Sequence, residues 1–81
     1  MILAKTDRDG NFEILENGDL GPVVEIFNEL TDEYEQQGKM LISDEGLTRE
    51  FATVDGGWDC VLIVAHGLAG AIKTEKDEDN L

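Results

Sequence analysis

The amino-acid sequence predicts an α+β fold in which one amphipathic helix packs on a mostly antiparallel sheet, in the order ββαβββ. Short β-prone runs occur before and after a single segment of helical periodicity, and turn dipeptides separate them. The apolar face of a helix needs an apolar surface to cover it, which a sheet supplies. The length of 81 residues allows one domain. We place this domain at residues 1–74 and expect residues 75–81 to form an acidic, flexible tail.

The amino-terminal segment predicts a β-hairpin. Residues 1–5 read as a short strand, and an Asp-Gly dipeptide follows as a turn. Phe12 and Ile14 then alternate with Glu13, which is the period-two pattern of a half-buried strand. An Asn-Gly dipeptide marks a second turn before the helix.

A helix is expected over residues 22–37. Proline is favoured at the first helical position, where its missing N–H would have no partner, so Pro22 is placed there. Gly38 is a natural terminator. Apolar and polar residues separate onto two faces with the period of a helix. The apolar face carries Val23, Ile26, Phe27, Leu30 and Tyr34, and the opposite face carries Glu25, Glu29, Asp32 and Gln36.

The carboxyl-terminal half predicts further strands. Residues 39–43 form a short apolar strand, and residues 47–54 form another, with a short helix as the alternative. Residues 58–65 are the most β-prone segment, and their continuous apolar run predicts a central strand buried on both faces. Residues 69–74 are a candidate for a last strand.

Composition and charge limit the possible partners and the location of the protein. Six Lys and Arg residues stand against 19 Asp and Glu residues, which gives a net charge of -13. A surface of this charge repels phosphate, so we expect neither nucleic acid nor an anionic membrane as a direct partner. One cysteine permits no internal disulfide. Neither a signal peptide nor an apolar run long enough to span a bilayer is visible, which predicts a cytoplasmic location.

The amino-terminal turn contains part of a calcium-loop pattern. Asp7, Asp9 and Asn11 occupy its first, third and fifth positions. The sixth position holds Phe12 instead of glycine, and the twelfth holds Gly18 instead of the bidentate glutamate. We therefore expect a polar hairpin turn at these residues and no metal site.

Cys60 and His66 are the other candidates for chemistry. Six residues along a strand span about 20 Å, too far for a thiol–imidazole pair, and two ligands cannot build a zinc site. Cys60 is expected to be a small buried hydrophobe and Trp58 a core or interface anchor. With no phosphate-binding loop either, the sequence predicts a binding protein without catalytic residues or cofactors, not an enzyme.

The acidic residues are concentrated in one stretch, because no basic residue occurs between Arg8 and Lys39. Glu25 and Glu29 form a like-charge i,i+4 pair, which destabilises a helix. Repulsion between like charges that no neighbouring cation offsets is expected at a functional surface. The candidate partner-binding residues are Asp9, Glu13, Glu16, Asp19, Glu25, Glu29, Asp32, Glu33 and Glu35.

In size, acidity and lack of catalytic motifs, the chain resembles phage-encoded DNA-mimic proteins. These inhibitors occupy the DNA-binding surfaces of host proteins such as restriction enzymes, uracil-DNA glycosylase, CRISPR complexes and nucleoid proteins. The resemblance implies a host-takeover protein that binds a basic DNA-binding protein in the host cytoplasm. We favour an HU-like nucleoid protein, because such proteins hold the DNA backbone with little base reading. Side chains at i and i+4 lie about 5–6 Å apart, the same order as neighbouring phosphates.

A homodimer is also expected. The resemblance implies it, because many DNA mimics dimerise to extend their charged track. The apolar strand also favours it, because its surface exceeds what one helix covers. An isologous two-fold arrangement is the usual form, and the interface candidates are Trp58, Val61 and Ile63.

Two other functions stay open. A small structural or adaptor module would contact its partner through Trp58 and the apolar strand. A housekeeping domain of a halophile would use its acidity only to maintain hydration at high salt.

Overall fold

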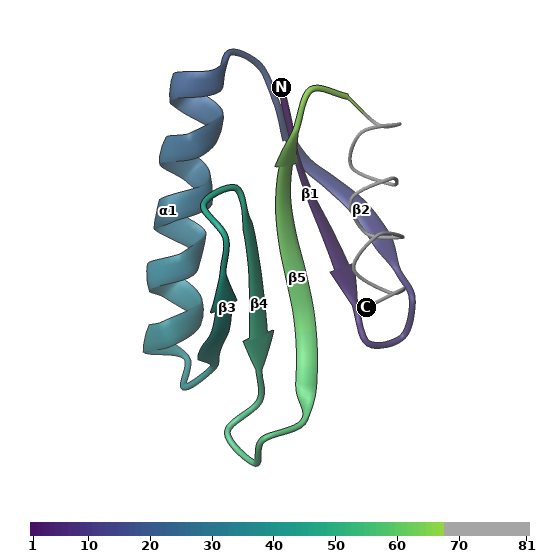
Figure 1. The fold of residues 1–81 in the computed structure, drawn as a ribbon, viewed down its shortest axis with the longest axis vertical. Helices are drawn as coiled ribbons and strands as arrows, with labels where there is room; N and C mark the ends of the chain where they lie inside the picture. Colours follow the sequence, from purple (N-terminus) through teal and green to yellow (C-terminus); the bar gives the residue numbers. More distant parts are fainter. Residues whose placement is uncertain (68–81) are drawn as a thin grey trace.

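The computed structural model describes residues 1–67, in which one helix packs on a five-stranded antiparallel sheet (Figure 1). The strand order in the sheet is β2-β1-β5-β4-β3. This confirms the predicted α+β class and the order ββαβββ. The candidate strand at residues 69–74 and the tail at 75–81 lie outside the described residues. The elements are β1 (Ile2–Asp7), β2 (Phe12–Asn17), α1 (Leu20–Gln36), β3 (Met40–Asp44), β4 (Thr48–Ala52) and β5 (Trp58–Ala65).

Strand β5 is the central strand, paired with β1 on one side and β4 on the other. Successive side chains of a strand point to opposite faces of the sheet. Leu62 and Val64 accordingly join the cluster beneath the helix, while Val61 and Ile63 join a second cluster on the other face. The prediction of a central strand buried on both faces is confirmed. Residues 48–52 form strand β4, not the alternative short helix.

The helix begins at Leu20, so the predicted start at Pro22 is wrong. Pro22 is the third helical residue. The first four N–H groups of a helix have no intrahelical partner, so proline is tolerated anywhere in the first turn. The first backbone bond runs from the Val23 N–H to the Asp19 carbonyl, at 3.1 Å. Within the described residues, no helix has the length and apolar character needed to cross a membrane.

Gly38 terminates the helix, as the sequence predicts. The last helical residue is Gln36, one residue before the predicted end. Gly38 has a φ of 91°, the left-handed conformation that glycine adopts without strain. Its N–H donates to the Glu35 carbonyl, and the Lys39 N–H donates to the Tyr34 carbonyl, both at 3.0 Å. This pair of bonds is the Schellman motif, which satisfies the last carbonyls and turns the chain into β3.

The inner face of α1 packs on the sheet. Val23, Phe27 and Tyr34 are buried against residues of the central strands, and the Tyr34 and Phe51 rings meet edge to face at 5.2 Å. Ile26 and Leu30 are partly buried beside them, as the helical periodicity predicts. This packing leaves the opposite face of α1 in solvent, where the acidic residues lie.

Candidate functional site

The outer face of α1 is lined with carboxylates. A helix turns about 100° per residue, which places Glu25, Glu29 and Asp32 opposite the buried Phe27 and Tyr34. All three carboxylates are exposed. The predicted separation of apolar and acidic residues onto opposite faces is therefore confirmed.

The charges of α1 oppose its dipole. Carboxylates stabilise the amino-terminal end of a helix and cations the carboxyl-terminal end. The first turn of α1 has no acidic residue and its last turn has no basic one. Glu33 and Glu35 lie instead near the negative end of the dipole, and Asp19 at the N-cap makes no side-chain capping bond. Glu33 and Glu35 therefore lie where a negative charge lowers the stability of the helix.

Strand β2 extends the acidic surface beyond the helix. Residues directly opposite in paired strands share a face of the sheet. Glu13 pairs with Lys5 and Glu16 with Leu3, and both partners face the helix. The two glutamates therefore lie along the β2 edge on the same side of the sheet as α1.

The structure places the nine predicted residues on three neighbouring segments: α1 with its N-cap, β2, and the β1–β2 turn, which holds Asp9. All are exposed except Glu16, which is half-buried. None of them forms an ion pair with another residue in the range 1–67. We call Glu13, Glu16, Asp19, Glu25, Glu29, Asp32, Glu33 and Glu35 the acidic surface.

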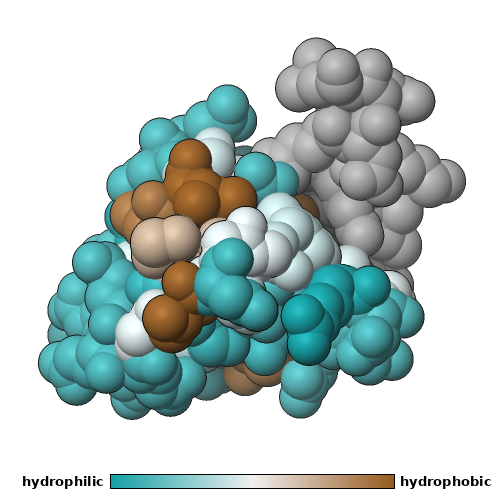
Figure 2. Space-filling view, turned by 90° about the horizontal axis from the view of Figure 1, so that it is seen from below, coloured by the Kyte–Doolittle hydropathy of each residue, from teal (hydrophilic) through white to brown (hydrophobic). Residues whose placement is uncertain are grey.

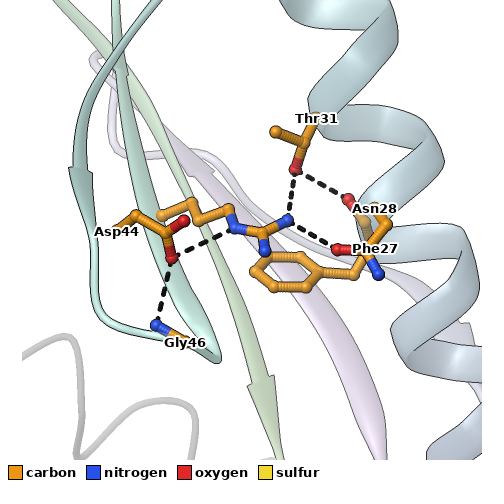
Figure 3. Close-up of polar contacts among 6 residues, drawn as sticks. Phe27, Asn28, Thr31, Asp44 and Gly46 are labelled. Carbon is orange, nitrogen blue, oxygen red and sulfur yellow. Dashed lines mark hydrogen bonds and ion pairs between the residues drawn. The ribbon is translucent and has the colours of Figure 1, made fainter.

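Lys5, Lys39 and Arg49 lie on the inner side of the helix, which the sequence reasoning did not predict. The guanidinium of Arg49 stacks on the Phe27 ring, with its carbon 4.3 Å from the ring centroid. Its Nη1 donates to Asn28 Oδ1 at 2.8 Å and to Thr31 Oγ1 at 2.9 Å (Figure 3). Its Nε lies 3.3 Å from Asp44 Oδ1, an ion pair without good hydrogen-bond geometry. Arg49 therefore joins β4 to α1 and β3.

Asp44 is held in place for this contact. The Gly46 backbone N–H donates to its Oδ1 at 3.1 Å (Figure 3). This hydrogen bond, together with Arg49, lowers the pKa of Asp44 below its ordinary value. Asp44 therefore stays ionised to a lower pH than an ordinary aspartate, and it remains a counter-charge for Arg49.

Two lysines surround the ring of Tyr34. Lys39 Nζ lies 4.7 Å from the ring centroid and Lys5 Nζ 5.4 Å from it, distances typical of cation–π contacts. Lys39 Nζ also donates to Asp59 Oδ2 at 2.6 Å, a pair with side chains 24% and 19% exposed. This hydrogen bond from Lys39 lowers the pKa of Asp59.

Three of the four basic residues in the range 1–67 therefore point into the helix–sheet layer, and Arg8 is exposed in the β1–β2 turn. A period-two signal was present in the sequence. Lys5 has the same parity as Leu3, and Arg49 the same parity as Phe51. Once the faces are assigned, that parity directs both cations toward the helix.

The calcium-like residues form a turn, as expected. Asp7 Oδ1 accepts the N–H groups of Asp9 at 2.9 Å and of Asn11 at 3.0 Å, and its Oδ2 accepts the Asn11 amide at 3.1 Å. These bonds, with those from Asn11 the largest, lower the pKa of Asp7. The carboxylate is used to hold the β1–β2 connection, and Gly10 supplies the positive φ that the turn needs.

Cys60 and His66 lie in different surroundings. Cys60 is fully buried beneath the helix, as expected of a small hydrophobe, and burial raises its pKa to about 11. His66 is exposed just beyond the end of β5. The structure does not bring the thiol and the imidazole together.

The three dimer-interface candidates differ in accessibility. Val61 and Ile63 are 3% and 2% exposed and already pack with Ile2 and Ala4 on the face opposite the helix. Trp58 is 37% exposed at the start of β5. Of the three, Trp58 alone retains substantial surface for a partner.

No protein-family model, curated protein or solved structure matches the chain.

Proposed function

We propose that this protein is a DNA mimic that binds and inhibits a basic DNA-binding protein through the acidic surface. The favoured partner is an HU-like nucleoid protein of a host cell. One observation carries the proposal. Three of the four Lys and Arg residues in the range 1–67 face the helix–sheet layer, whereas the carboxylates of α1 and β2 have no ion-pair partner within that range.

The arrangement is hard to explain by solubility alone. A soluble surface usually intersperses both signs of charge, and Glu–Lys pairs at i,i+4 stabilise exposed helices. Here Arg49 contacts Phe27, and Lys39 contacts Tyr34 and Asp59, in the helix–sheet layer. The outer face keeps Glu25 and Glu29 as a repelling pair. A partner that supplies Lys and Arg side chains would relieve this repulsion on binding.

The expected mode of binding is electrostatic. Proteins that hold the DNA backbone place Lys and Arg side chains against successive phosphates. The carboxylates of α1 recur at a similar spacing, and Glu13 and Glu16 add a second row along the β2 edge. Formation of such a complex would release fewer counterions than formation of a protein–DNA complex. The complex would still weaken as salt screens the charges.

The first experiment is displacement of a fluorescent DNA duplex from a purified HU-like protein. Displacement is expected at about 50 mM salt and should be largely lost by about 200 mM, the range over which backbone contacts weaken strongly. No displacement at the lowest salt would contradict the choice of an HU-like partner. Displacement that persists unchanged at high salt would contradict the electrostatic mode of binding.

The second experiment locates the binding surface. The variant E25Q/E29Q removes two charges from the acidic surface. The control E50Q/E75Q makes the same change of net charge at two positions outside it. The first variant should weaken displacement by about tenfold or more and the control by much less. Equal effects would mean that net charge alone, and not the acidic surface, determines binding.

A further inference from the structure

The sheet has two faces, and α1 covers one of them (Figure 1). Among residues 1–67, α1 is the one element that packs on the sheet, and it lies over the cluster that contains Leu62 and Val64. We call the opposite face the far face. The buried apolar residues of the far face are Ile2, Ala4, Val61 and Ile63.

The side chains of the far face are more deeply buried than the sheet alone explains. Side chains stand roughly perpendicular to a sheet, so neighbours within the sheet cover their sides but not their ends. Ala4 pairs with Ile63 on one side and with Ile14 on the other, which places both isoleucines on the far face. Ile63 is 2% exposed, whereas Ile14 is 47% exposed. The one further neighbour of Ile63 in the sheet, Thr48, is too small to account for this difference, so another group lies over Ile63.

A polar residue of the far face gives the same indication. Thr6 pairs with Val61, which places it on the far face, and it is 6% exposed. Its Oγ1 is buried and has no hydrogen-bond partner in the described part of the chain. Because a buried hydroxyl without a partner lowers stability, we expect the group that covers Thr6 to offer a backbone N–H or carbonyl.

We infer that residues 68–72 of the same chain cover the far face. Strand β5 ends at Ala65, which pairs with Ile2 at one end of this face. The sequence continues after Gly67 with the apolar run LAGAI, and charges begin at Lys73. From Ala65 to Val61 the face extends about 13 Å along β5, and five extended residues span about 16 Å. The run is therefore apolar, close to the face and long enough to cover it.

A second apolar surface lies too far from the end of β5 for these residues. Met40 and Trp58 are 46% and 37% exposed, and Val54, in the turn between β4 and β5, is 76% exposed. Figure 2 looks at the end of the molecule that includes this turn, and apolar surface there lies among hydrophilic surface. Trp58 is the first residue of β5 and Ala65 the last, about 23 Å apart along the strand. The chain therefore leaves β5 beside the far face and not beside this exposed surface.

Packing of residues 68–72 on the far face would also separate a cation from the acidic surface. Four of the six Lys and Arg residues lie within residues 1–67, and the other two are Lys73 and Lys76. Because Lys73 directly follows the packed residues, it would be held on the side of the sheet opposite α1. The inference follows from the far face alone, so it holds whether or not the protein binds a DNA-binding partner.

NMR spectroscopy of the full-length protein tests where residues 68–72 lie. Nuclear Overhauser contacts are expected between the methyl groups of Ile72 or Leu68 and those of Val61 or Ile63. Contacts with Met40 or Trp58 instead, or none with the sheet, would overturn the inference. In a sample mixed from two isotope-labelled populations, contacts between Ile63 of one copy and another copy would assign the far face to a second copy and would overturn it as well.

Thermal unfolding of the full-length protein measures the contribution of the segment. Ile72→Ser should lower Tm by about 5–10 °C, because it removes apolar surface that packing on the far face buries. Ile14→Ser is the matched control, because Ile14 is on the same face and 47% exposed, and it should lower Tm by less than about half as much. A Tm of I72S equal to that of the wild type would contradict packing of Ile72 on the sheet.

Discussion

On the inner side of α1, Arg49 and Lys39 each meet an aromatic ring and a carboxylate. On the outer side, Glu25, Glu29 and Asp32 have no ion-pair partner within residues 1–67. Charges are therefore paired on the inner side of the helix and unpaired on its outer side. Inside, opposite charges are paired in a partly dry layer, where such contacts stabilise the fold. Outside, like charges are placed together, where they oppose it.

Under the proposed function, the outer side of α1 serves binding and the inner side serves stability. Lysine or arginine on the outer face would give α1 stabilising i,i+4 pairs, but would offset part of the negative charge of the acidic surface. Keeping Lys39 and Arg49 inside preserves their stabilising contacts and leaves the surface negative. Substitutions on the two sides should therefore change stability in opposite directions.

The largest effect is expected from Arg49→Ala. The substitution removes the hydrogen bonds to Asn28 and Thr31 and the stacking on Phe27. We expect a loss of about 2–3 kcal/mol in the free energy of unfolding, measured by urea denaturation. Arg8→Ala is the control, because Arg8 is exposed, and it should change the value by less than about 0.5 kcal/mol. Equal losses would mean that Arg49 stabilises the protein through net charge and not through its contacts.

A smaller loss is expected from Asp59→Asn, which leaves Lys39 without its ion-pair partner. The pKa of Asp59 is lowered from 3.8 in the folded protein, chiefly by Lys39, so the pair stabilises the fold above that value. The expected loss is about 1–2 kcal/mol near neutral pH. As the pH falls through the folded pKa, wild-type Asp59 becomes protonated and the difference between the proteins should shrink.

Unfolding measured from about pH 7 down to about pH 2.5 tests this dependence, because the window extends below the ordinary pKa of an aspartate, where a lowered folded pKa begins to reduce stability. A difference that stays constant to the acid end would show that the loss comes from altered packing and not from the charge of Asp59. Lys39→Met should reproduce the acid-dependent part, because Asp59 then has no cation to lower its pKa.

The fold and the acidic surface could be predicted from the sequence because both depend on local patterns. The continuous apolar run of β5 predicts burial on both faces, and the period of 3.6 in α1 assigns its buried face. The start of the helix could not be predicted from Pro22, because proline is compatible with any position in the first turn. The sign that was overlooked is Asp19, a favoured N-cap residue type that stands directly before Leu20.

The inward cations could not be predicted without the three-dimensional pairing. The parity of Arg49 assigns it to the helix side only when the face of β4 is known, and its contacts with Asn28 and Thr31 join segments far apart in sequence. Burial of Val61 and Ile63 in the central strand was predicted, but their choice as dimer-interface candidates overlooked that Ile2 and Ala4 pack against them. A strand pattern identifies two apolar faces but not which side chains lose contact with solvent.

The smallest effect, and the one of opposite sign, is expected from E25Q/E29Q. Removing a like-charge i,i+4 pair should raise the free energy of unfolding by about 0.2–0.5 kcal/mol. The gain should be largest at low salt, where screening is weakest, and is best measured as a rise in Tm. E50Q/E75Q is the control, because it makes the same change of net charge outside residues 20–36, and it should raise Tm less. If E25Q/E29Q is more stable but displaces less DNA, the same two carboxylates cost stability and supply binding, which is the trade-off expected of a functional surface. A drop in Tm would mean that Glu25 and Glu29 stabilise the fold, and the reason for assigning them to a partner would be lost.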